Sequence, residues 1–271
     1  MNTVATASTP TRRRLLTILL LALAAAALLA SGATQARQRY LTRGIPARPE
    51  PIPLGGPQVG VNVYLTDADD AKLRATLEEI ADTGIGYVKQ SFFYDESVDW
   101  TTADRLMAAA TAESLTVVPL LDGDPQVNYA PPDPAAFAAW AGAFAARYGD
   151  RVDAYIVWDE PNLAGHWGSQ PANPAEYAAL LRATATAIRA ADANATIVAA
   201  PLAPTTESGP QNLSETIFLR GLYAAGAADA FDAVALKPYG FDSGPDDRRV
   251  GADVLNFSRA ILIRELLLEL D

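Results

Sequence analysis

The chain has 271 residues, half of them hydrophobic, and its 32 acidic and 21 basic residues give a net charge of -11. This acidic balance argues against a nucleic-acid partner, because nucleic acids bind basic patches. With no cysteine and a single histidine, His166, the chain can build neither a disulfide, a thiolate nucleophile nor a multi-histidine zinc site. Its chemistry must come mainly from carboxylates, Tyr, Lys, Arg and backbone groups, and we expect no cofactor and no metal.

The first 36 residues have the features of a signal peptide or an N-terminal anchor. Arginines at positions 12–14 precede an apolar stretch at 15–30, which is short for a membrane-spanning helix. Small residues follow as cleavage sites, and "TRRRLL" resembles a twin-arginine signal. We therefore predict export to the cell surface or medium, with membrane anchoring only through residues 15–30. Residues 37–57, rich in Pro, Gly and Arg, are predicted to be a linker.

Apolar strands and amphipathic helices alternate after the linker. Strands are predicted at 58–64, 85–91, 115–121, 152–158, 195–200 and 231–237. Asp133 and Asn173, each followed by proline, mark the starts of two of the helices between them. Alternating apolar strands and helices predict a parallel sheet covered by helices on its faces.

Two parallel architectures compete, a doubly wound sheet and a (β/α)8 TIM barrel. A doubly wound sheet usually has a glycine-rich phosphate turn after its first strand, and "NVYLTDADD" has none. A barrel carries functional polar residues at the carboxyl ends of its strands. Residues in such places are Asn62, Gln90, Asp122, Asp159, Glu160, Lys237 and Tyr239. The pattern favours a TIM barrel over residues 58–271. Only about six βα units fit there, so we expect an incomplete barrel, a fragment with strands seven and eight missing.

The segment "AYIVWDEPNLAGHWG", residues 154–168, places two carboxylates directly after a buried strand. Glu160 at this position is a candidate general acid/base, since a strand end in a barrel faces the active site. The alternative is structural, with Asp159 or Glu160 capping the segment that follows. Side chains of consecutive strand residues point to opposite faces, so we do not expect Asp159 and Glu160 to share one pocket.

This segment resembles the W-N-E-P-N signature of retaining glycoside hydrolases of the large TIM-barrel clan, whose catalytic glutamates lie on strands four and seven. The similarity extends over residues 58–271. "YVKQSFFYDESVDWTTADRLM" resembles the second strand and a tryptophan-containing loop, and "FDAVALKPYGF" resembles strand six, which usually reads His-Pro-Tyr. The members most like this chain are bacterial β-xylosidase-like and cellulase-like enzymes.

The resemblance implies roles for individual residues. Glu160 matches the acid/base, and Asp159 stands where the family has an asparagine that binds the sugar 2-hydroxyl. Tyr239 matches the tyrosine that orients the nucleophile, and Lys237 replaces the usual histidine. Lys237 has a structural alternative, an ion pair with an acid at the barrel mouth. The nucleophile belongs on strand seven, outside this chain, so we expect the truncated chain alone to be inactive.

The remaining candidates line the same predicted barrel mouth. We predict as substrate-binding Trp158, Asn162, Trp167, Gln90 and Asn62, with Asp122, Glu207 and Trp100 as weaker candidates. For Trp100 and Trp167 the alternative is packing against their own loops, and His166 is expected to be a hydrogen-bonding loop residue.

Three functions remain open. The first is an exported retaining glycosidase acting on β-linked poly- or oligosaccharide. The second is a non-catalytic carbohydrate-binding relative, and the third a Schiff-base lyase that uses Lys237.

Overall fold

The structure is a computed structural model that describes residues 10–44 and 59–271. Most of the predicted linker, residues 45–57, and the first nine residues of the predicted signal lie outside the described residues. The strands are β1 (Gly60–Val63), β2 (Tyr87–Phe93), β3 (Thr116–Asp122), β4 (Ala154–Val157), β5 (Thr196–Leu202) and β6 (Ala233–Leu236). The longer helices are α1 (Pro10–Thr42), α2 (Asp70–Asp82), α3 (Thr101–Ala112), α4 (Pro134–Tyr148), α5 (Pro174–Ala191), α6 (Glu215–Ala224) and α7 (Arg259–Leu270).

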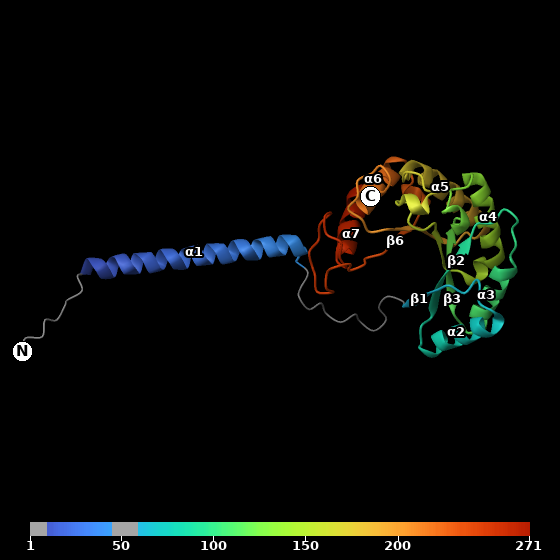
Figure 1. Cartoon of the computed structure of the whole chain (residues 1–271), viewed down its shortest axis with the longest axis horizontal. Helices are drawn as coiled ribbons and strands as arrows, with labels where there is room; N and C mark the ends of the chain where they lie inside the picture. Colours follow the sequence, from blue (N-terminus) through green and yellow to red (C-terminus); the bar gives the residue numbers. More distant parts are fainter. Residues whose placement is uncertain (1–9, 45–58) are drawn as a thin grey trace, which may run out of the picture.

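The six strands form one parallel sheet in the order β1-β2-β3-β4-β5-β6. Strand order that follows chain order belongs to a TIM barrel, whereas a doubly wound sheet reverses at its switch point. The sheet curls into a half-barrel with helices on its outer side (Figure 1). All six predicted strands are confirmed, and β1 and β6 form the two edges of the arc in the described part of the chain.

The helix caps predicted from sequence are present. Asp133 Oδ1 accepts hydrogen bonds from the backbone N–H of Ala135 and Ala136 at 2.9 and 3.1 Å, and Asn173 caps α5 in the same way. Glu176 does not close a capping box. Its carboxylate instead accepts a hydrogen bond from Trp167 Nε1 at 3.2 Å.

The core lies between the sheet and the outer helices and is rich in aromatic rings. Trp140 and Phe144 of α4 are buried against the sheet, and Trp100 stacks on Trp140 with ring centroids 6.2 Å apart. Trp100 was a candidate for stacking on sugar, but it is half-buried in this cluster. Its packing role, the alternative considered from sequence, is the one observed.

The N-terminal helix α1 extends away from the α/β body (Figure 1). By length and composition α1 could cross a membrane, and a signal sequence would pass the same test. The helix continues to Thr42, so residues 37–42 of the predicted linker are helical. Contacts with the body lie at the C-terminal end of α1. Leu41 O accepts a hydrogen bond from Val250 N–H at 2.6 Å, and Arg43 pairs with Glu265 at 3.2 Å.

A buried ion pair joins the first residue of α7 to the first residue of α6. Arg259 Nε lies 2.6 Å from Glu215 Oε1, and the two side chains are only 2% and 4% exposed. A second guanidinium nitrogen lies 2.9 Å from Glu215 Oε2, and Arg259 also donates to the backbone carbonyls of Ala252 and Val254. Every polar atom of the Glu215 carboxylate therefore has a partner.

Candidate active site

The exit from β4 is an unusual turn of the backbone. β4 ends at Val157, and Trp158 and Glu160 then adopt positive φ angles of 71° and 49°. Such angles are uncommon for residues other than glycine and cost free energy, so the surrounding contacts must maintain them. Trp158 N–H donates to Leu121 O of β3, and Glu160 N–H donates to Pro201 O of β5. The turn is therefore fixed to the strands on both sides.

This turn brings both carboxylates to Lys237, the residue that follows β6. Lys237 Nζ lies 2.8 Å from Asp159 Oδ1 and 2.7 Å from Glu160 Oε1. The expectation that the two carboxylates would not share a pocket is wrong, because the chain has left the extended strand after Val157. The structural alternative for Lys237, an ion pair with acids at the barrel mouth, is confirmed.

Lys237 is charged in this arrangement. Burial alone would lower its pKa, but the charge of Asp159 and the hydrogen bonds to Asp159 and Glu160 outweigh burial, so the pKa lies above its ordinary value. A Schiff-base lysine must be neutral to attack a carbonyl group. The geometry therefore disfavours the lyase that was considered from sequence.

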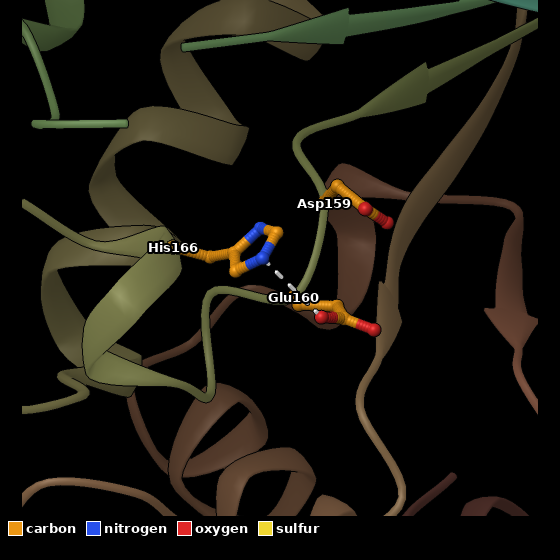
Figure 2. Close-up of side chains that lie close together, drawn as sticks. All are labelled: Asp159, Glu160 and His166. Atoms are coloured by element: carbon orange, nitrogen blue, oxygen red, sulfur yellow. Dashed lines mark ion pairs between the residues drawn. The ribbon is translucent and has the colours of Figure 1, made fainter. Parts of the chain in front are cut away.

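His166 lies on the other side of Glu160, in the short helix Ala164–His166. Its Nε2 atom is 3.5 Å from Glu160 Oε2, and its ring stacks on Tyr129 with centroids 4.7 Å apart. Figure 2 shows the imidazole facing the Glu160 carboxylate, with Asp159 on the same turn. One oxygen of Glu160 thus faces the ammonium group and the other faces the imidazole.

Asp159, Glu160 and His166 also have the spacing of a metal site, since one ligand atom of each lies within 4.8 Å of the others. The Lys237 ammonium group already lies between the two carboxylates, so a divalent cation would have to displace it. The donor set fits a metal only if Lys237 moves away.

Asp122 supports the turn from the end of β3. It is 3% exposed, and its Oδ1 accepts hydrogen bonds from Gly123 N–H at 2.9 Å and from Asp159 N–H at 3.3 Å. Burial, together with the negative charge of Asp159, raises the pKa of Asp122 to about 8. Asp122 therefore holds a proton at neutral pH and positions Asp159.

A cavity of about 230 Å³ opens beside these groups on the inner side of the sheet. It is lined by Asn62, Lys89, Ile156, Pro201, Ala235, Leu236, Lys237, Pro238 and Tyr239. Of the predicted binding residues, Asn62, Lys237 and Tyr239 thus reach this space, and Tyr239 is 56% exposed. A larger cavity, about 420 Å³, lies beside the segment between β6 and α7, and neither cavity is lined by Asp159 or Glu160.

Sequence reasoning missed Lys89, in the middle of β2. Burial lowers its pKa; the charge of Asp159 acts in the opposite direction, and that of Lys237 adds to the lowering. A signal was present in "YVKQS", because a lysine next to the buried Val88 must point to the opposite face of the sheet.

Two predicted substrate-binding residues of the β4 exit are fully buried. Trp158 is 0% exposed and its Nε1 donates to His166 O at 3.0 Å. Asn162 is also 0% exposed, and its amide donates to the carbonyls of Ala203 and Leu213 and accepts from Ala203 N–H. All the polar atoms of these two side chains join loops, so neither side chain is open to a ligand in this arrangement, and their contact with substrate stays a prediction.

Trp167 and Gln90 are buried in the same way. Each is 1% exposed. Trp167 packs edge-on against Trp158 with centroids 5.2 Å apart. Gln90 accepts from Leu65 N–H and donates to Ser91 O. Both side chains are buried and do not line the cavity of about 230 Å³, so their contact with substrate also stays a prediction.

No family model and no curated protein matches this chain. Solved structures with a similar fold include the endo-1,4-beta-mannanase from Rhizomucor miehei, at a TM-score of 0.49 and 12% identity, covering 66% of each chain. The beta-galactosidase from Marinomonas ef1 matches at a TM-score of 0.43 and 10% identity. The match covers 67% of this chain and 40% of the beta-galactosidase chain.

Endoglucanase Cel5A from Thermotoga maritima matches at a TM-score of 0.39 and 16% identity, covering 54% of this chain and 53% of its own. All three are glycoside hydrolases, the class that the "WDEPN" resemblance implied. This chain spans less than two thirds of their length, and the fold assignment rests on its own strand order.

Proposed function

We propose that the protein is an exported glycoside hydrolase that cleaves β-linked poly- or oligosaccharide by a retaining double displacement. Glu160 is the acid/base, and the nucleophile comes from outside the described residues. The observation that carries the proposal is the position of Glu160. Its side chain is 15% exposed at the carboxyl end of β4. It contacts Lys237, which lines a cavity of about 230 Å³. That volume lies below the roughly 300–1,000 Å³ of drug-sized ligand sites, which suits a single sugar residue.

The first displacement requires Glu160 to donate a proton to the leaving oxygen while the nucleophile attacks the anomeric carbon. Glu160 then takes a proton from water in the second step. The Lys237 ammonium group lies 2.7 Å from Glu160 Oε1 and so occupies one of the two oxygens that could reach the glycosidic oxygen. Under this proposal Lys237 stays on Asp159 when substrate enters, and Glu160 is released to the glycosidic oxygen.

Asp159 has two tasks in this scheme. It holds the Lys237 ammonium group, and it takes the place of the asparagine that binds the sugar 2-hydroxyl in the family it resembles. An ionised Asp159 accepts a hydrogen bond from that hydroxyl and cannot donate one. Its Oδ2 atom lies 3.0 Å from Lys237 Nζ, so the hydroxyl and the ammonium group compete for the same carboxylate.

A second candidate is a non-catalytic carbohydrate-binding protein with the same fold. The observation in its favour is the same contact, because Lys237 occupies a Glu160 oxygen that a catalytic acid would turn toward the leaving group. Sugar binding without turnover would follow if Lys237 never leaves Glu160.

Aryl β-glycosides with good and poor leaving groups separate the two candidates. The test uses the natural polypeptide, including any sequence beyond residue 271. Glu160→Gln should lower turnover about 10²–10⁴-fold for poor leaving groups and far less for activated ones, because only the former need protonation. Glu79→Gln, the same change on exposed α2, serves as the control.

Equal loss on both kinds of substrate would contradict the role of Glu160. Sugar binding by the wild type without hydrolysis of any aryl glycoside would instead favour the binding protein.

A further inference from the structure

The two lysines that line the cavity differ in their partners. Lys237 has two carboxylates within 3 Å. Lys89 is half-buried on β2 and makes no hydrogen bond or ion pair within residues 10–44 and 59–271. An ammonium group taken from water without a partner costs free energy, which an opposite charge would offset.

The acidic groups near Lys89 act on it only at a distance, because none of them contacts its ammonium group among the described residues. Asp159, Asp122 and Glu160 all act on it through space. Asp159 and Glu160 are bound to Lys237, and Asp122 holds a proton at neutral pH because it is buried. Lys89 therefore keeps its N–H donors free at the wall of the cavity.

Asn62 lies beside this cation. Asn62 of β1 pairs in register with Lys89 of β2, so the two side chains project from the same face of the parallel sheet into the cavity. An ammonium group and an amide N–H2 together form a donor pair for a carboxylate, and charge-assisted hydrogen bonds of this kind are the stronger ones.

We propose that Lys89 and Asn62 form a subsite for the carboxylate of a uronic acid residue. This inference rests on the proposed function, because it needs the glycosidic oxygen of the same sugar to lie at Glu160. In a hexuronic acid the pyranose ring separates the anomeric carbon from the C6 carboxylate. One ring can therefore present its glycosidic bond to the β4 side of the cavity and its charge to the β1–β2 side. The substrate class is then an acidic β-glycan that contains glucuronate or galacturonate.

The test compares methyl β-D-glucuronide and methyl β-D-galacturonide with the corresponding neutral methyl hexosides, by NMR titration of the 271-residue chain. Each pair differs only at C6. We expect the wild type to bind one uronide about tenfold more tightly than its neutral partner, the size of one charge-assisted hydrogen bond. Lys89→Met should remove this preference, and Lys89→Arg should retain part of it.

Lys72→Met is the matched control, since Lys72 is exposed on α2 away from the cavity, and it should keep the full preference. Thermal unfolding of Lys89→Met verifies that the fold survives. Equal binding of uronides and hexosides, or a preference that persists in a folded Lys89→Met, would overturn the subsite and leave the proposed function standing. A wild type that binds none of the four sugars would likewise overturn the subsite, whereas the proposed function is tested separately by the aryl glycosides.

Discussion

Two ion clusters, Arg259 with Glu215 and Lys237 with Asp159 and Glu160, differ in how completely their polar atoms are paired and buried. Arg259 and Glu215 are 2% and 4% exposed, and the carboxylate has a nitrogen partner on each oxygen. Lys237, Asp159 and Glu160 are 15–17% exposed, and Lys237 lines a cavity. The first cluster joins two helical segments and has no donor or acceptor to spare for a ligand. The second can exchange its partners, as a catalytic carboxylate must.

Removal of one partner from the closed cluster should have the largest effect on stability. Glu215→Gln leaves the Arg259 guanidinium buried without a counter-charge, and we expect a loss of about 3–5 kcal/mol in the free energy of unfolding. Urea titration measures this. Glu269→Gln, which breaks the exposed pair with Arg220, is the control and should leave unfolding unchanged within error. A loss below about 1 kcal/mol for Glu215→Gln would show that the buried pair contributes no more to stability than an exposed pair does.

The free energy of unfolding should depend on pH through Asp122, which lies next to the cluster of Lys237, Asp159 and Glu160. Its folded-state pKa is about 8, against an ordinary value of 3.8. Between these values the folded state binds a proton that the unfolded state lacks, so stability falls as pH rises from about 4 to 8. We expect the wild type to lose about 2–3 kcal/mol between pH 5 and 7 relative to Asp122→Asn.

The asparagine keeps the side-chain oxygen that accepts from Gly123 and Asp159. Subtraction of the two unfolding curves at each pH cancels every other group. Parallel curves for wild type and Asp122→Asn from pH 4 to 8 would show that Asp122 is ionised in the folded state.

Lys237→Met should have the smallest effect on stability, about 1–2 kcal/mol at pH 7, because its carboxylate partners retain access to water. The folded-state pKa of Lys237 lies above 10.5, so its contribution is fully present below pH 10.5 and is lost as pH rises through the folded-state value. Urea titrations at pH 7 measure the difference. If Lys237→Met lowered the free energy of unfolding as much as Glu215→Gln does, the two clusters would not differ in their contribution to stability.

Sequence patterns predicted the scaffold well and the site only in part. Alternating apolar strands and the caps Asp133 and Asn173 depend on local chemistry, so they were readable from sequence. The positive φ angles at Trp158 and Glu160 depend on contacts with β3 and β5, which no local pattern contains. That turn brings the carboxylates of Asp159 and Glu160 to the same ammonium group, that of Lys237.

Burial explains the remaining differences. A tryptophan or amide after a strand can face the barrel mouth or the helices, and Trp158 and Asn162 face inward because neighbouring loops use their polar atoms. Lys89 was missed because a lysine within a strand has no motif to mark it, although the alternation of the strand placed it on the inner face.

Azide rescue of Glu160→Ala is the most direct measurement of the central claim that Glu160 is the acid/base of a retaining glycosidase. The alanine removes the base that activates water in the second displacement, and azide needs no base to attack the glycosyl-enzyme intermediate. The account predicts that azide restores turnover of an activated aryl β-glycoside by the natural polypeptide and that NMR identifies the product as a β-glycosyl azide. No rescue, or an α-glycosyl azide, would contradict it.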